Sequence, residues 1–123
     1  YEIAPDNELN GITFGGVGSG TTVEYIQVHE NADDGIEFFG GTVNLKYVVL
    51  TSNQDDSVDW DNGFRGNLQY VLVKHDPENG PANRAIEADN DGSTPNKQPQ
   101  SNPTIANMTV IGNTFDTADA ELA

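Results

Sequence analysis

Short runs in which apolar and polar residues alternate recur along the chain. The longer kind has six residues, with an apolar residue at its first, fourth and sixth positions and Tyr at its third position in three of four copies. The four copies are Val23–Val28, Leu45–Leu50, Leu68–Val73 and Ile105–Val110. Because no segment of useful length shows the spacing of an amphipathic helix, each run predicts a short β-strand.

A second series of shorter runs lies between the first. Its members are Gly11–Phe14, Gly35–Phe38, Ser57–Trp60 and Ala85–Ala88. In both series the shortest spacing between copies is 22 residues. A unit of this length, with two short strands and no helix, is typical of one coil of a parallel β-solenoid. We therefore expect an all-β solenoid of about four to five coils with a period of about 22 residues.

Stacking of the coils predicts which residues share a column. Equivalent residues of neighbouring coils should lie about 4.8 Å apart, as in adjacent strands of a sheet. The expected interior columns are Ile12, Ile36, Val58 and Ile86 in the shorter series and Ile26, Val48, Val71 and Met108 in the longer one. Phe38 and Trp60 are expected in the core. The wider spacing of the last copies predicts a loop insertion near residues 76–103, with an exposed loop from Asn90 to Pro103.

Other all-β and repeat architectures fit this pattern less well. A β-propeller needs longer, four-stranded units, and a leucine-rich repeat needs its Leu signature. A β-sandwich would show alternation without matched repeats. The solenoid is therefore the preferred interpretation.

The charge balance limits the partners that the chain can have. Its 123 residues suffice for one domain, and 20 Asp and Glu against five Lys and Arg give a net charge of −15. Such a surface repels nucleic acid and anionic membranes and favours Ca²⁺, which prefers carboxylate and carbonyl oxygens. The chain has no Cys, which excludes thiolate chemistry, and no apolar stretch of the ~20 residues that span a membrane. It starts without Met, so we expect residues 1–123 to be a single solenoid segment of a longer protein.

Three stretches resemble a known protein family. Gly20–His29, Asp33–Val43 and Asp55–Trp60 are similar to secreted bacterial right-handed parallel β-helix proteins with a pectate-lyase-like solenoid, often described as lipoproteins or hypothetical proteins. The resemblance spans residues 7 to 112, and its most specific part is Gly-Gly-Thr-Val after Glu-Phe-Phe. It implies a right-handed helix at the exterior or the cell surface of a bacterium. It implies no established activity.

Acidic residues recur at the turns before the shorter strands. Stacking should place Asp33, Asp55 and Asn83 in one column, Asp34, Asp56 and Arg84 in the next, and Glu37, Asp59 and Glu87 in an outward one. Carboxylates at about 4.8 Å repel one another by roughly 1 kcal/mol per pair in water, so the arrangement requires compensation. Arg84 could neutralise one column, the Asp side chains could cap backbone N–H groups, or Ca²⁺ could lie between Asp33 and Asp55. All three interpretations stay open at this point.

A second candidate calcium site is the segment Glu87–Gly92. Glu87, Asp89 and Asp91 stand at positions one, three and five before a Gly, as in the first half of an EF-hand loop. The first position is Glu, Gln98 stands where a bidentate Glu is expected, and no flanking helix is predicted. The candidate metal ligands are therefore Glu87, Asp89 and Asp91 together with Asp33 and Asp55, and Ca²⁺ is the expected ion.

Catalysis is an alternative role for the acidic columns. If the chain is a polysaccharide lyase or glycoside hydrolase of the β-helix type, then Asp56, Asp59 and Arg84 are the candidate catalytic residues, because stacked carboxylates can supply an acid–base pair or bind Ca²⁺. His29 and His75 have no Ser or Cys partner at a recognisable spacing. Since fold does not imply function, we regard catalysis as the secondary hypothesis.

Tyr25, Tyr47 and Tyr70 share one column and are expected to form an aromatic stack at a bend, or a platform for sugar rings. The leading hypothesis is a non-catalytic extracellular solenoid whose acidic, turn-rich faces have a structural or ligand-binding role. Its candidate partners are a polysaccharide or a neighbouring solenoid chain. Free strand edges would also permit end-to-end self-association into a filament. Neither a nucleic-acid partner nor membrane insertion is expected.

Overall fold

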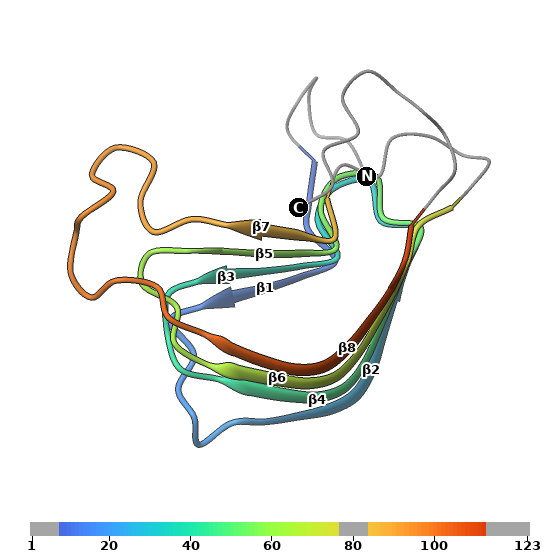
Figure 1. The fold of residues 1–123 in the computed structure, drawn as a ribbon, viewed down its shortest axis with the longest axis horizontal. Coiled ribbons are helices and arrows are strands. Elements are labelled where there is room, and N and C mark those ends of the chain that lie inside the picture. The colour runs from blue at the N-terminus through green and yellow to red at the C-terminus, as the bar shows by residue number, and fades with distance from the viewer. Residues whose placement is uncertain (1–7, 77–83, 113–123) are drawn as a thin grey trace.

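The computed structural model describes residues 8–76 and 84–112 of the chain. Within these ranges every regular element is a β-strand (Figure 1). In chain order the strands are β1 (Ile12–Gly15), β2 (Thr22–His29), β3 (Ile36–Phe39), β4 (Asn44–Thr51), β5 (Val58–Asp61), β6 (Asn67–Lys74), β7 (Ile86–Ala88) and β8 (Thr104–Ile111). No helix that could cross a membrane was found in the part of the chain that the structure describes.

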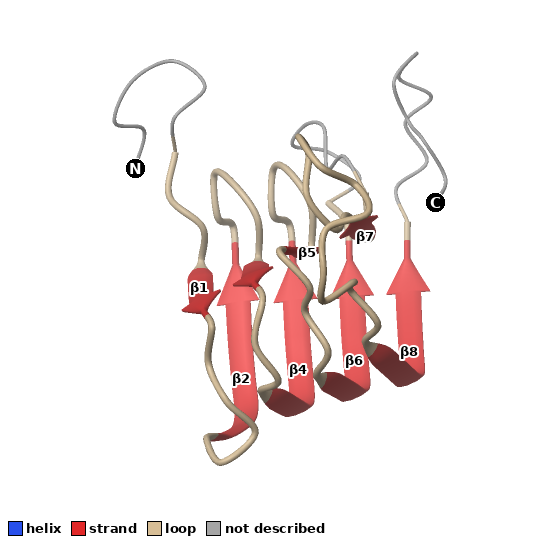
Figure 2. Cartoon of the chain, turned by 90° about the vertical axis from the view of Figure 1, so that its left-hand side faces the viewer, coloured by secondary structure: helices blue, strands red, loops and turns tan. Residues whose placement is uncertain are grey.

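Short and long strands alternate along the chain and separate into two sheets (Figure 2). The short sheet has the order β1-β3-β5-β7, the long sheet has the order β2-β4-β6-β8, and all neighbours are parallel. We call one short strand together with the long strand that follows it a rung. This is the architecture of a parallel β-helix, consistent with a right-handed one, and it confirms the predicted fold class.

The strand registers define the two predicted interior columns. In the short sheet the paired residues are Ile12, Ile36, Val58 and Ile86. In the long sheet they are Ile26, Val48, Val71 and Met108. Both columns match the prediction, and Ile36 and Val58 are at most 1% exposed.

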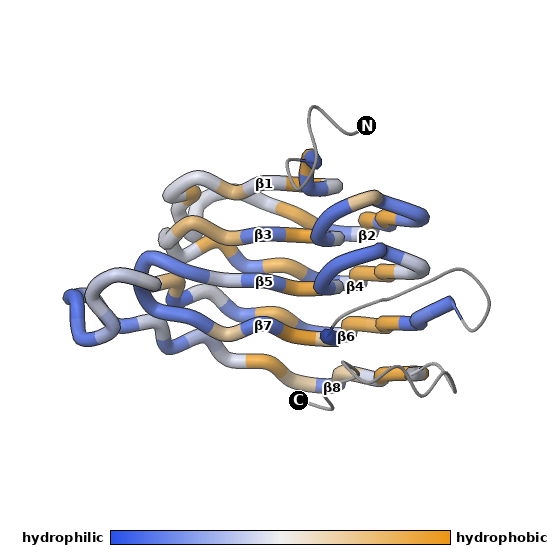
Figure 3. Tube along the Cα trace, turned by 90° about the horizontal axis from the view of Figure 1, so that it is seen from above, coloured by the Kyte–Doolittle hydropathy of each residue, from blue (hydrophilic) through white to orange (hydrophobic). Residues whose placement is uncertain are grey.

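The core lies inside the coil, where apolar residues recur at the same place in successive rungs (Figure 3). Phe38 stacks between Phe14 and Phe64, with ring centroids 5.2 and 4.1 Å away. Trp60 is in register with Phe38 and is 9% exposed, so both belong to the core as predicted. Each inner rung is covered by a rung on either side, whereas Ile12 of the first rung is only partly buried.

Gly35 occupies a position where two rungs approach closely. A Cβ at this residue would lie against the side-chain amide of Asn53 and 2.6 Å from the carbonyl oxygen of Ser57. The Nδ2 atom of Asn53 is buried and has no hydrogen-bond partner in the described part of the chain. A side chain at residue 35 would therefore displace Asn53 from the space between the rungs.

Each long strand bends at its fourth residue. Tyr25, Tyr47 and Tyr70 have φ angles of +57°, +58° and +60°, and Asn107 has +54°. At this bend two consecutive side chains, such as Lys46 and Tyr47, are exposed, which strict strand alternation would not allow. The bend explains the spacing of the apolar positions. It also confirms the prediction that the tyrosines lie at a bend. Asn tolerates this left-handed backbone, whereas for Tyr it costs ~1–2 kcal/mol.

The loop between β7 and β8 extends away from the two sheets (Figure 1). Asn90 organises it, because its Nδ2 donates to two loop carbonyls at 2.8 and 3.0 Å and its Oδ1 accepts from the N–H of Ser101 at 2.7 Å. The predicted exposed loop from Asn90 to Pro103 is thus confirmed. The short strand β7 lies within the predicted insertion at 76–103, and residues 77–83 fall outside the described ranges.

Candidate cation site at the acidic corner

Acidic residues gather where a long strand turns into the next short strand. Asp33 and Asp34 precede β3, and Asp55 and Asp56 precede β5. The short strands add Glu37, Asp59 and Glu87, which are in register with one another. We call this set of seven residues the acidic corner: Asp33, Asp34, Glu37, Asp55, Asp56, Asp59 and Glu87. Asn83, predicted to continue the Asp33 column, lies outside the described residues.

Two groups of three carboxylates in this corner are close enough to share a cation. In the group Asp33, Asp34 and Asp55, and again in the group Asp34, Glu37 and Asp59, one ligand atom from each residue lies within 4.8 Å of the others. Asp34 belongs to both groups and is 7% exposed. The structure thus brings the predicted Asp33 and Asp55 together.

Asp34, Glu37 and Asp59 were not among the metal ligands named from the sequence, and Asp59 was named there only as a candidate catalytic residue. The repeat contained the necessary signal, because Asp34 directly follows Asp33 and Glu37 stands in the same column as Asp59. The sequence repeat does not reveal the curvature of the backbone at the corner. This curvature brings side chains of the turn and of the strand close together.

Two aspartates of the corner cap the rung that follows them. Asp34 Oδ1 accepts from the backbone N–H of Asp56 at 3.1 Å, and Asp56 Oδ1 accepts from the backbone N–H of Arg84 at 2.7 Å. The turn-capping interpretation is therefore correct for this column. Capping leaves the negative charge of each side chain in place, so it does not remove the repulsion between neighbouring carboxylates.

Burial and like charge raise the pKa values of these carboxyls. Loss of solvation raises the pKa of Asp34 to about 7, opposed by the hydrogen bond that it accepts and reinforced by the neighbouring carboxylates. Desolvation is also the largest cause of the raised pKa values of Glu37 and Asp59. For Asp56, desolvation and the adjacent Glu87 act in the same direction. Arg84 lies beside Asp56 and Glu87, whereas the carboxylates around Asp34 at neutral pH either hold protons or need a compensating cation.

The column of Glu37, Asp59 and Glu87 faces away from the core, as predicted. It is nonetheless poorly exposed in the middle, because Asp59 has Glu37 and Glu87 as its register neighbours and is 9% exposed. The side-chain amide of Asn10 donates to Glu37 from the preceding rung. An outward position therefore does not give Asp59 the solvation of a surface carboxylate.

The EF-hand-like candidate is arranged differently from an ion-binding loop. Glu87 Oε1 lies 3.0 Å from Arg84 Nη1, and Asp91 Oδ2 lies 2.6 Å from Lys97 Nζ. This contact with Lys97 is the main reason why the pKa of Asp91 is lowered. Asp89 is exposed. The three predicted ligands thus face separate surroundings, and a calcium ion bound by them stays a prediction.

The three candidate catalytic residues lie in or beside the same corner. Asp56 is 1% exposed, and its Oδ2 lies 3.7 Å from Arg84 Nη1. Asp59 is 9% exposed. Such burial restricts the access of a polymeric substrate to either carboxylate. A catalytic role for Asp56, Asp59 and Arg84 remains an untested prediction.

Comparison with protein families bears on the whole chain. The family model described as a pectate-lyase-like β-helix domain matches residues 1–123. The chain belongs to this family. Membership in the pectate-lyase-like β-helix family agrees with the two parallel sheets and with the resemblance seen in the sequence. Searches of curated proteins and of solved structures found no match. The role of this β-helix domain must therefore be argued from its own residues.

Proposed function

We propose that this pectate-lyase-like β-helix domain is a non-catalytic module that acts outside the bacterial cell and binds a divalent cation, preferably Ca²⁺, at the acidic corner. The observation that carries the proposal is the position of Asp34 in both carboxylate groups. Asp34 is 7% exposed, so its ionised form lacks hydration. A cation between the carboxylates would supply the missing stabilisation.

The ligand chemistry favours Ca²⁺ over Mg²⁺. Ca²⁺ accepts roughly six to eight oxygens in flexible geometry, so three carboxylates completed by water and carbonyl oxygens suit it. Mg²⁺ requires a nearly ideal octahedron and gives up its water reluctantly. A site with few protein ligands binds weakly, with a Kd of about 10⁻⁴ to 10⁻³ M as in extracellular calcium modules.

Thermal melting with added ions tests the proposal. Ca²⁺ binds the native state, so a concentration about ten times Kd should add about 1.4 kcal/mol to the free energy of unfolding and raise Tm by several degrees. Mg²⁺ at the same concentration should raise Tm less, and a chelator should reverse the effect. A melting curve that is indifferent to Ca²⁺ and to chelator would contradict the proposal.

Asp34→Asn is the informative variant. Asn retains an acceptor oxygen for the backbone N–H of Asp56 but removes one charge from both carboxylate groups. The calcium-dependent shift in Tm should therefore disappear while the fold persists. Glu24→Gln is the matched control, because it removes one charge from the long sheet and should keep the full shift. An equal calcium effect in Asp34→Asn and wild type would place the ion elsewhere.

A further inference from the structure

The two sheets of the solenoid differ sharply in charge. The short strands carry four acidic residues, Glu37, Asp59, Asp61 and Glu87, and no Lys or Arg. The long strands carry a single acidic residue, Glu24, together with Lys46 and Lys74. In a chain of net charge −15, the outer face of the long sheet is therefore close to neutral.

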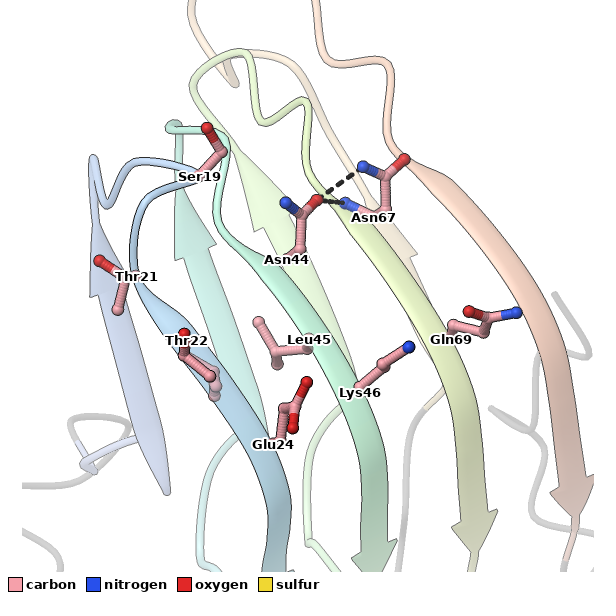
Figure 4. Close-up of a pocket in the computed structure, with 10 residues that line it drawn as sticks. Ser19, Thr21, Thr22, Glu24, Asn44, Leu45, Lys46, Asn67 and Gln69 are labelled. Atoms are coloured by element: carbon pink, nitrogen blue, oxygen red, sulfur yellow. Dashed lines mark hydrogen bonds between the residues drawn. The ribbon is translucent and has the colours of Figure 1, made fainter.

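A polar groove of about 280 Å³ crosses the first half of the long strands (Figure 4). Glu24, Lys46 and Gln69 project from β2, β4 and β6 in one register row. Asn44 and Asn67 lie beside them, with Asn44 Oδ1 accepting from the Asn67 side chain at 2.6 Å. The remaining polar lining consists of the hydroxyls of Ser19, Thr21 and Thr22. The groove thus offers both donors and acceptors, and its two opposite charges cancel.

A second groove, of about 610 Å³, lies next to it at the bend of the same strands. Tyr25, Tyr47 and Tyr70 line it as a stacked ladder, with centroids 4.6 and 5.0 Å apart and rings inclined by 14° and 7°. Both faces of the Tyr47 ring are covered by its neighbours, so the ladder presents ring edges. Tyr25 is 75% exposed and keeps one open face. Outward Val49 and Leu72 complete the apolar part.

We propose that the outer face of the long sheet binds a neutral polysaccharide strand that runs across β2, β4, β6 and β8. Sugar hydroxyls both donate and accept hydrogen bonds, which matches the amides and hydroxyls of the polar groove. The apolar face of a sugar ring can stack on the open face of Tyr25, and Val49 and Leu72 add apolar contact along the same groove. Register positions recur about every 4.8 Å along the solenoid, so a polymer that runs across the strands meets Glu24, Lys46 and Gln69 in turn.

Charge selects the class of polymer. Lys46 has Glu24 in register beside it, so the groove presents no cluster of cations that would attract carboxylate or phosphate. The net charge of −15 also repels an anionic polymer at long range. This face lies on the long sheet, apart from the acidic corner of the short sheet, and its occupant needs no divalent cation.

Native gel electrophoresis with embedded polysaccharide tests this inference. The gels contain hydroxyethyl cellulose, galactomannan, dextran or polygalacturonate, and EDTA keeps the acidic corner free of divalent ions. At least one neutral polymer should retard the protein, and polygalacturonate should not. Gln69→Ala removes one amide from the groove and should weaken the apparent affinity about fivefold, the effect of losing one hydrogen bond. Tyr25→Ala should have a comparable effect.

Gln100→Ala serves as the control, because it removes an exposed amide from the loop outside both grooves. It should leave retardation unchanged, and melting curves check that every variant folds. Absence of retardation by all three neutral polymers, equal retardation by polygalacturonate, or unchanged binding by Gln69→Ala would overturn the inference. So would a dimer in sedimentation velocity that Tyr47→Ala dissociates, because it would assign this face to a second copy of the chain.

Discussion

The carboxylate of Asp34 accepts a hydrogen bond from the backbone N–H of Asp56, the residue that holds the same position in the next rung. Asp56 repeats this contact with the backbone N–H of Arg84. These two side chains connect one rung to the next. Burial opposes their ionisation. Rung connection and charge are therefore coupled in one column.

This coupling predicts an unusual pH dependence for Asp34→Asn. Because the pKa of Asp34 is raised from 3.8 to about 7, the native state retains a proton that the unfolded state loses over this range. The free energy of unfolding of the wild type should therefore fall as pH rises from about 4 to about 7. Asn has no proton to lose, so without divalent ions the variant should be more stable at about pH 8, by roughly 1–3 kcal/mol.

Urea denaturation near pH 3 and near pH 8 measures this difference. The two proteins should have similar stability at the lower pH, where Asp34 is mostly protonated in both its folded and unfolded forms. Burial lowers the pKa of His75, and because both proteins contain this residue its contribution should cancel in the comparison. Parallel pH profiles for variant and wild type would contradict the prediction.

Truncation of Ile36 should weaken the core of an inner rung. The Ile36 side chain is 0% exposed and is in register with Ile12 and Val58. Ile36→Ala removes buried methyl groups and leaves a cavity, so we expect a loss of about 2–4 kcal/mol in the free energy of unfolding. Ile12→Ala makes the same chemical change in the partly buried first rung and should cost less. Equal losses measured by urea denaturation would count against the stacked core.

The tyrosine ladder can be measured by comparing two substitutions at equivalent bends. Tyr47→Asn and Tyr25→Asn both relieve the cost of a left-handed Tyr backbone, and Asn107 already holds the matching position in β8. Tyr47 stacks on two rings and Tyr25 on one. Tyr47→Asn should therefore be the less stable variant by about 0.5–1.5 kcal/mol, the contribution of one stacked pair. Thermal or urea denaturation gives the difference, and a null result would mean that stacking contributes nothing at this bend.

Removal of the Asn90 side chain should loosen the loop without unfolding the solenoid. Asn90→Ala deletes three hydrogen bonds that connect Asn90 with Pro95, Lys97 and Ser101. Limited proteolysis should then cleave the loop faster, while the melting temperature changes little, because the loop lies outside the core. Asn96→Ala, an exposed change in the same loop, is the control. Unchanged cleavage in Asn90→Ala would show that other contacts hold the loop.

The fold could be predicted from the sequence because, in a solenoid, equivalent residues of successive repeats contact one another. Once two series shared a period, the pairing of Ile36 with Val58 and of Val48 with Val71 followed directly. The bend at Tyr47 was also recognisable, since the apolar positions around it break strict alternation. Repetition carried this information without any long-range argument.

The candidate site was only partly predictable, for two physical reasons. The burial of Asp59 depends on side chains of both neighbouring rungs, and an alignment of the sequence repeats does not show it. The EF-hand-like spacing around Asp91 likewise did not reveal that Lys97 Nζ, six residues later, approaches its carboxylate within 2.6 Å. Sequence spacing shows which residues are close along the chain. It does not show which side chains come into contact when a loop folds back on itself.

That loop also shows how the solenoid tolerates change. After Asn90–Pro103 the chain rejoins the helix with the N–H of Thr104 donating to the carbonyl of Gly66 at 3.0 Å, and β8 pairs with β6 in unbroken register. The length of this corner is therefore independent of the length of the strands on either side. A foreign peptide grafted between Asn90 and Thr104 would project from the same edge of the scaffold while the core remained untouched, so this corner is a position at which new binding specificity can be installed.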